Sequence, residues 1–303
     1  MRTRRPPRIR VKPPTRHKRF TLFGDEGKLL RSVLIGVGAA ALLLILIVAS
    51  RPEPQLMSSA EIQNVKARGI LRVGVRDGIP GFSDNGDGLE AALARALGAR
   101  MLPGIPGSAA VKLVSVTSFT AGARLDDATI DVALALLEKD ASTKYLYSDA
   151  YFSEPARFLM PEGKENEPIY NLTVGCIQAA PWMGSSSGDK LPSAGQKLLT
   201  AYVTAHHGDG VQIKTFASYD DMLTALQSGS IGAAVMTDIY IAKYRESYAF
   251  SVSPAALGSV SYAMACTTDS PAYAQLFNLM LAEMKENGSL AALYEEYGLA
   301  VPE

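Results

Sequence analysis

Histidine and cysteine, the residues that most often carry metal and nucleophilic chemistry, are scarce in this chain. Its 303 residues include three histidines and two cysteines. His206 and His207 end a predicted helix, and no carboxylate or cysteine stands near them at the spacing of a metal site. Cys176 and Cys266 fall in separate predicted strands, which favours buried free thiols over a disulfide. The sequence therefore predicts no metal centre and no cofactor, and it lacks a Gly-x-Ser-x-Gly or phosphate-loop motif.

The overall composition is that of a globular protein, but its charge is divided unevenly. Apolar residues make up 48% of the chain and charged residues 20%. Residues 1–31 contain 11 Lys and Arg against 2 acidic residues, and residues 32–303 contain 19 against 28. Phosphate contacts need a basic face, so the acidic body argues against nucleic acid as a partner.

An apolar segment follows the basic tail. Residues 33–49 carry no polar side chain, and Ser32 and Ser50 extend the segment to residues 32–50. As a helix it would span roughly 28 Å, about one hydrocarbon core. Flanking basic residues stay in the cytoplasm, so we expect a single transmembrane helix with tail 1–31 inside, touching membrane lipids, and the body outside. A cleaved secretory signal is the alternative, because small residues end at Ser50, although Arg51 and Pro52 follow at once.

After a predicted extended linker (residues 51–59), strand patterns alternate with helix patterns. This rhythm is typical of an α/β structure with a mostly parallel sheet. The near-continuous apolar run at 131–137 predicts a strand covered on both faces. The other predicted strands are residues 70–76, 111–116, 172–177, 211–216, 232–237 and 262–267. The predicted helices are residues 88–100, 194–205, 219–228, 271–287 and one short helix from Ser289.

The order of these pieces resembles the extracellular solute-binding proteins of family 3, the polar amino-acid receptors of ABC importers. Each matching piece is weak alone, whereas their order and spacing over about residues 60–299 are fairly specific. The matching pieces are residues 69–75 with 79–83, 115–118 with 124–125 and 130–133, 147–151, 221–229 with 233–238, and 287–290 with Tyr294 and 297–298.

The resemblance implies a two-lobed periplasmic-binding-protein-like fold, with two mixed, mostly parallel sheets flanked by helices. Lobe one would comprise residues 60–153 and 258–303, and lobe two residues 154–257. Two hinge crossings would lie near residues 152–158 and 250–258. The solute would bind in the cleft beyond the carboxyl ends of the strands, and the lobes would close on it.

The resemblance also implies a pair of charges for an amino-acid solute. Asp238 matches the family's acid that binds the ammonium group, although a carboxylate there could equally cap the next helix. The arginine that normally binds the carboxylate is missing from the segment around Ala141. Lys144 is its nearest substitute, with Lys139 as a second choice, and a lysine cannot form the bidentate fork.

Four further positions are expected to contact the solute. Phe82 could stack on it or pack locally, and Arg124 could bind an acidic side chain. Trp182, the only tryptophan, stands in the second-lobe ligand loop and could line the cleft or fill a core. Ser118 follows the strand at 111–116.

The sequence thus predicts a membrane-anchored extracytoplasmic protein, not an enzyme, that captures a small polar solute such as an amino acid for an ABC permease. A solute sensor or adaptor with a degenerate cleft is the first alternative, favoured by the missing arginine. A dehydratase on the same fold is the second, with Glu138 or Glu154 as the general acid.

Overall fold

The structure is a computed structural model that describes residues 52–139, 142–180, 191–206 and 210–302. The chain divides into two units, Met1–Pro52 and Glu53–Glu303. Within the described residues, no helix is long and apolar enough to cross a membrane. The predicted tail and transmembrane helix at 1–31 and 32–50 lie outside the described residues, as does Trp182.

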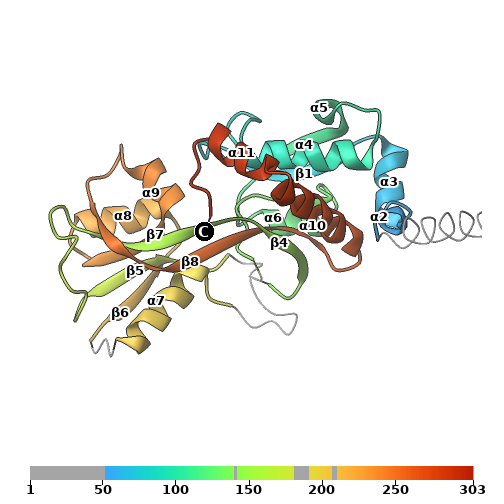
Figure 1. The fold of residues 1–303 in the computed structure, drawn as a ribbon. Helices are drawn as coiled ribbons and strands as arrows, with labels where there is room; N and C mark the ends of the chain where they lie inside the picture. Colours follow the sequence, from blue (N-terminus) through green and yellow to red (C-terminus); the bar gives the residue numbers. More distant parts are fainter. Residues whose placement is uncertain (1–51, 140–141, 181–190, 207–209, 303) are drawn as a thin grey trace, which may run out of the picture. The chain divides into compact units, whose positions relative to one another are not determined.

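Glu53–Glu303 is built on one sheet of eight strands, in the order β2-β1-β3-β8-β4-β7-β5-β6 (Figure 1). At one end β2, β1 and β3 pair in parallel and form the first strand group. At the other end β7, β5 and β6 pair in parallel and form the second strand group. The strand bounds are β1 Leu71–Arg76, β2 Val111–Val116, β3 Val132–Ala133, β4 Tyr145–Met160, β5 Thr173–Ile177, β6 Gln212–Phe216, β7 Ala233–Thr237 and β8 Ser251–Thr267.

Two long antiparallel strands, β4 and β8, connect the two strand groups (Figure 1). β8 pairs with β3 of the first group, and β4 pairs with β7 of the second. The α/β fold class is therefore confirmed. The two expected sheets are hydrogen-bonded into one, because the predicted crossings fall inside β4 and β8 and continue their ladder. The exact lobe boundaries stay a prediction.

Helices cover both strand groups. α4 packs on β1 and β2, α10 packs on β4 and β8, and α11 packs on α4 and α10. In the second group α7 and α8 pack on β5 and β7, and α9 packs on β4 and β7. The helix bounds are α2 Pro52–Leu56, α3 Ala60–Arg68, α4 Leu89–Met101, α5 Gly107–Ala110, α6 Ala121–Asp126, α7 Ala194–Ala205, α8 Tyr219–Gln227, α9 Asp238–Tyr244, α10 Pro271–Glu286 and α11 Ser289–Glu296.

The apolar run at 131–137 is buried on both faces, as its composition predicts. Val132 belongs to the main core, whereas Ala133 belongs to a second core with Leu125 of α6. Successive strand residues point to opposite faces, which explains the division. The prediction of a strand through residue 137 is wrong, because β3 ends at Ala133. Ala135 and Leu136 have positive φ angles of 49° and 50°, which no strand accommodates.

The predicted extended linker is also corrected at its start, since α2 is a short helix. Its two prolines lie in the first turn, where the missing N–H groups break no helical hydrogen bond. Glu53 of α2 accepts hydrogen bonds from Arg100 of α4, with a shortest distance of 2.6 Å. Arg100 also binds Glu283 of α10 at 2.7 Å. These long-range ion pairs hold a segment whose composition alone predicts an extended chain.

The predicted start of α8 is confirmed by its capping contacts. The Ser218 hydroxyl accepts a hydrogen bond from the Asp221 backbone N–H at 3.1 Å and donates to the Asp221 carboxylate at 2.7 Å. The two cysteines are free and buried, as predicted, in β5 and β8.

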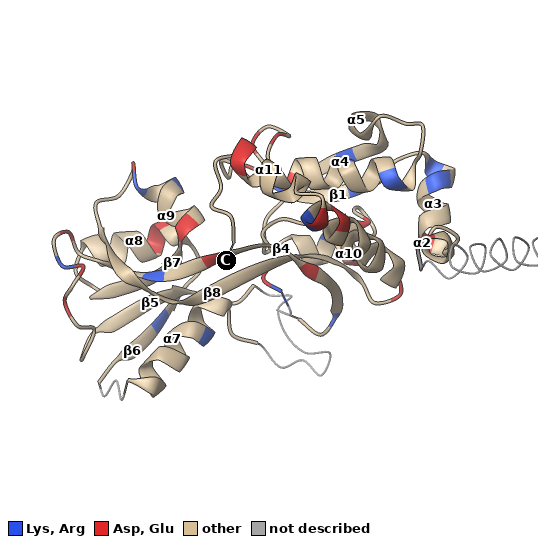
Figure 2. Cartoon of the chain, viewed as in Figure 1, with Lys and Arg blue, Asp and Glu red and all other residues tan. Residues whose placement is uncertain are grey.

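Acidic and basic residues are interspersed along the described elements (Figure 2), and several of their side chains form ion pairs. Asp131, for example, pairs with Arg68 at 2.5 Å and with Arg72 at 2.6 Å. The Asp131 side chain is only 8% exposed, so these pairs form a half-buried cluster in which the carboxylate depends on its two arginine partners.

The loop before α4 requires glycine at residue 88. Gly88 has a φ of 120°, and a Cβ there would lie 2.5 Å from the backbone of Phe82. We expect Gly88→Ala to lower the free energy of unfolding by about 2 kcal/mol, measured by chemical denaturation. The control is Gly78→Ala, which shares a positive φ but places its Cβ with no described atom within 4 Å. Equal effects of the two substitutions would show that the close approach at Gly88 is unimportant.

Candidate functional site

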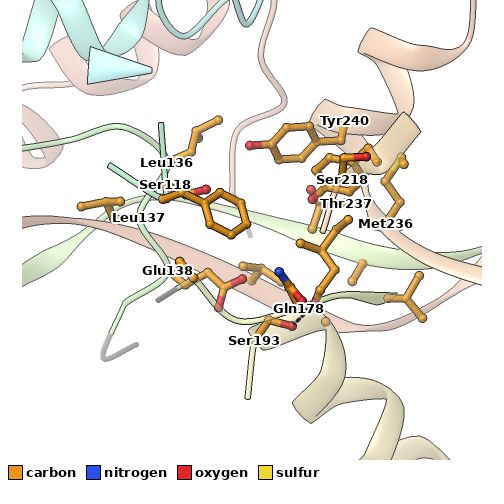
Figure 3. Close-up of a pocket in the computed structure, with 18 of the residues that line it drawn as sticks. Ser118, Leu136, Leu137, Glu138, Gln178, Ser193, Ser218, Met236, Thr237 and Tyr240 are labelled. Atoms are coloured by element: carbon orange, nitrogen blue, oxygen red, sulfur yellow. Dashed lines mark hydrogen bonds between the residues drawn. The ribbon is translucent and has the colours of Figure 1, made fainter. Parts of the chain in front are cut away.

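A pocket with a volume of about 260 Å³ is lined by residues of both strand groups and of β4 and β8 (Figure 3). Arg76, Ser118 and Glu138 come from the first strand group and the loops that follow its strands. Gln178, Ser218 and Tyr240 come from the second group and its helices. The lining is mixed, with apolar side chains such as Leu136 and Met236 beside hydroxyl, amide and charged groups.

The lining residues gather there because parallel strands end at the same edge of a sheet. Arg76 is the last residue of β1, and Ser118 follows β2. Gln178, Ser218 and Thr237 stand at or just after the ends of β5, β6 and β7. In open α/β sheets this edge is where small molecules bind. The pocket therefore lies where the fold itself favours a ligand site.

A buried carboxylate shapes the wall contributed by the first strand group. Glu90 of α4 accepts hydrogen bonds from the backbone N–H of Leu136 at 2.6 Å, from that of Arg76 at 2.9 Å and from the Tyr151 hydroxyl at 2.6 Å. Burial raises the pKa of Glu90, and these donors oppose the rise. The bond to Leu136 holds the positive-φ backbone at Ala135 and Leu136. Strained non-glycine backbone of this kind is concentrated at functional sites.

Glu138, which follows this loop, contacts the second strand group through α7. Its Oε2 accepts a hydrogen bond at 2.7 Å from the backbone N–H of Ala194, the first residue of α7. Ser193, the N-cap, accepts from the Gln196 N–H at 3.3 Å. Figure 3 shows Glu138 on the same side of the pocket as Gln178 and Ser193. Burial raises the pKa of Glu138, whereas the α7 N–H and the charge of Lys197 lower it.

Tyrosine rings form part of the opposite wall. Tyr219 and Tyr240 are stacked with ring centroids 4.3 Å apart, and Tyr244 lies 5.7 Å from Tyr219. Burial raises the pKa of Tyr240 above its usual value, and the positive charge of Arg76 acts in the opposite direction. Arg76 has the same effect on Tyr219 and Tyr244. The positive charge of Arg76, at the end of β1, therefore influences tyrosines that belong to the second strand group.

A second buried carboxylate lies behind the pocket. Glu154 of β4 accepts hydrogen bonds from the Tyr262 hydroxyl at 2.6 Å and from the Ile239 N–H at 2.7 Å. Burial raises the pKa of Glu154 to about 7. Tyr262 lines the pocket, whereas Glu154 does not. Glu154 thus supports the pocket wall from behind.

The residues expected from the resemblance are placed in different surroundings. Ser118 lines the pocket. Phe82 is fully buried in the core, with its ring edge-to-face on Phe152 at 5.0 Å, and does not line the pocket. The structure places Phe82 in the packing role that the sequence left open. Solute contact by either residue stays a prediction.

The three expected charged residues each have an opposite charge nearby and do not line the pocket. Asp238 pairs with Arg157 at 2.9 Å. Lys144 is exposed and pairs with Asp126 at 2.6 Å. Arg124 is half exposed and lies 3.9 Å from Asp127. Their roles in solute binding remain predictions, since each would have to leave a partner on the protein.

The sequence reasoning missed Arg76 as a site residue and considered Glu138 only as a general acid. A signal was available, because both residues directly follow apolar runs that predict strands. A charged residue at the carboxyl end of a parallel strand is a candidate ligand contact in any α/β fold. Among the residues that the structure describes, no group of three or more His, Cys, Asp or Glu side chains could hold a metal ion.

A family match that covers most of the described sheet and its pocket places this fold in the class of bacterial solute-binding proteins. Residues 71–300 match the bacterial extracellular solute-binding proteins, family 3, and the chain belongs to this family.

Solved structures of the same fold include a mutant of ArgBP from T. maritima, 21% identical over 78% of this chain and 98% of that one, with a TM-score of 0.57. The solute receptor for L-cysteine of Neisseria gonorrhoeae is 20% identical over 78% and 92% of the two chains, with a TM-score of 0.58. An ancestral amino acid-binding protein, AncCDT-1, described as a precursor of cyclohexadienyl dehydratase, is 19% identical over 78% and 99%, with a TM-score of 0.57.

Proposed function

We propose that this protein is a membrane-anchored, extracytoplasmic receptor that captures an amino acid or a related small polar solute and delivers it to an ABC permease. The observation that carries the proposal is the pocket at the strand ends, which takes its lining from both strand groups. A solute held by both groups favours the state in which they are close together, so binding energy drives closure about β4 and β8. Family membership and amino-acid-binding neighbours support the solute class.

The solute is tested by thermal shift and calorimetry on the full-length chain in detergent, with the standard L-amino acids, polyamines and small carboxylates. A ligand at about 100 times its Kd stabilises the folded state by about 2.7 kcal/mol, so we expect the Tm to rise by about 5 °C or more for at least one amino acid. Heat-inactivated chain is the calorimetric control. A screen in which no amino acid shifts the Tm, at concentrations up to 10 mM or so, would favour the sensor or adaptor with a degenerate pocket.

The anchor is assigned to residues 32–50, with residues 1–31 in the cytoplasm, on the strength of the apolar run and its basic flank. It is tested by expressing the full chain and washing the membranes with alkaline carbonate. The chain should stay in the pellet, and a variant with polar residues throughout 33–49 should be released. Release of the unmodified chain, or its amino-terminal sequence starting near Arg51, would indicate a cleaved signal instead.

A dehydratase is the second candidate, because Glu138 borders the pocket with a raised pKa and a neutral carboxyl group can act as a general acid. The neighbour described as a precursor of cyclohexadienyl dehydratase shows the same fold. Incubation with a prephenate-like acid distinguishes the two proposals. A receptor leaves the compound unchanged, whereas an enzyme releases water and carbon dioxide in a reaction that Glu138→Gln abolishes.

A further inference from the structure

We infer that the pocket recognises a zwitterion with two opposite charges of its own: Arg76 binds the acidic group of the solute, and Glu138 binds its amino group and keeps anions away from the amino-terminal end of α7. This assignment rests on the proposed function and names the residues that would carry it.

The first step concerns α7, whose twelve residues make its amino-terminal end a natural anion site. Two of the N–H groups at that end are already taken by side chains of the protein itself. Glu138 takes the Ala194 N–H, and the Ser193 hydroxyl takes the Gln196 N–H. An anionic solute would have to displace a carboxylate that is tethered within reach. The acidic group of a solute must therefore bind elsewhere.

The second step concerns the free side of Glu138. Within the described part of the chain, the hydrogen bond to Glu138 is accepted by Oε2, and no donor reaches Oε1. Burial disfavours the charged form of this carboxylate. An ammonium group beside it would offset that cost and supply the missing donors. The pocket thus offers an acceptor suited to an amine.

The third step concerns Arg76, the other charged residue of the lining. Its backbone N–H is held by Glu90, which fixes where its side chain begins. No acidic partner lies within ion-pair distance of its guanidinium among residues 52–139, 142–180, 191–206 and 210–302. By contrast, Asp238 and Lys144 are paired outside the pocket. Arg76 is therefore the cation available to a carboxylate.

The first experiment is calorimetry on the full-length chain with the tightest-binding of the twenty standard L-amino acids and its two analogues, the amine without the carboxylate and the acid without the amino group. We expect Arg76→Gln to weaken binding of the amino acid at least tenfold and to leave the affinity for the amine unchanged. Glu138→Gln should weaken binding of the amino acid at least tenfold and leave the affinity for the acid that lacks the amino group unchanged. Arg245→Gln and Glu167→Gln are the matched controls, because they are the same changes at exposed residues that do not line the pocket. Unchanged affinity in Arg76→Gln or Glu138→Gln, with the Tm retained, would overturn the assignment.

The second experiment uses inorganic sulfate and does not depend on finding a solute. Glu138→Ala frees the amino-terminal end of α7, whose Gly195 lines the same pocket as Arg76, so we expect at least tenfold tighter sulfate binding than in the unmodified chain. Glu138→Gln keeps an oxygen near the Ala194 N–H and should gain much less. Equal sulfate affinity in the unmodified chain and in Glu138→Ala would show that Glu138 does not exclude anions from the amino-terminal end of α7. If no amino acid binds but sulfate behaves as expected, the proposed function fails while the role of Glu138 at α7 stands.

Discussion

Replacement of Glu90 by alanine is expected to lower the free energy of unfolding by about 3 kcal/mol. The change leaves three donors without an acceptor: the buried Leu136 N–H and Tyr151 hydroxyl and the partly buried Arg76 N–H. Each unsatisfied donor costs about 1–3 kcal/mol, and removing a buried carboxylate recovers part of the sum. The positive-φ backbone at Ala135 and Leu136 also loses the contact that holds it.

Chemical denaturation of the Glu90 variants measures this effect. Glu90→Gln retains one carbonyl acceptor in the same place, so we expect a smaller loss than in Glu90→Ala. Because Leu136 lines the pocket, solute affinity should fall in Glu90→Ala even at temperatures where the protein is folded. A loss below about 1 kcal/mol in Glu90→Ala would mean that water replaces the carboxylate and that the strained loop holds itself.

Stability is expected to fall as the pH rises from about 4.5 to about 7, because of Glu154. Its folded-state pKa of about 7 lies above the ordinary value of 4.5, so between these values the folded chain holds a proton that the unfolded chain has released. The stabilisation is complete below the unfolded pKa and is lost as the pH rises through the folded pKa. The difference corresponds to about 3 kcal/mol for this residue, whose exposed fraction is 4%.

The contribution of Glu154 is isolated by comparing the unmodified chain with Glu154→Gln across the pH range. Glutamine carries no charge at any pH, and its amide can donate to the Tyr262 hydroxyl while its oxygen accepts from the Ile239 N–H. We expect Glu154→Gln to gain about 3 kcal/mol relative to the unmodified chain between pH 4.5 and pH 8. Glu90 and Glu138 titrate in both proteins and cancel in the difference. A difference that is flat with pH would show that Glu154 ionises near its ordinary pKa.

Local patterns predicted those elements whose determinants are close in the sequence. α7 occupies the predicted residues 194–205, and α8 begins at the predicted capping serine, because each helix start is set by a side chain that bonds within three residues. The prediction of a strand over residues 131–137 was wrong because its end is set by a contact with a distant residue. Its backbone leaves the strand conformation at Ala135, and the Leu136 N–H that follows bonds to Glu90, 46 residues earlier. An apolar pattern reports burial, and burial is common to strands and to covered loops.

The predicted site residues show the same difference between what is local in the sequence and what depends on distant contacts. The resemblance drew attention to Asp238, Lys144 and Arg124, whose chemical types suit an amino acid. Their pairing with Arg157, Asp126 and Asp127 depends on which charges the fold brings near. Arg157 and Asp238, for instance, are 81 residues apart. A sequence shows which charged residues a chain contains. Whether two of them form an ion pair depends on a separation of a few ångströms that only the folded structure sets.

The sequence by itself determined the α/β class, the family and the free state of the two cysteines, and it supplied the case for an anchor. These properties follow from composition, local periodicity and the order of motifs along the chain. Only the tertiary structure decided that β4 and β8 join the strands into one sheet and that Arg76 and Glu138 line one pocket. The physical reason is that these features depend on contacts between distant residues, which close packing and backbone hydrogen bonds select together when the whole chain folds.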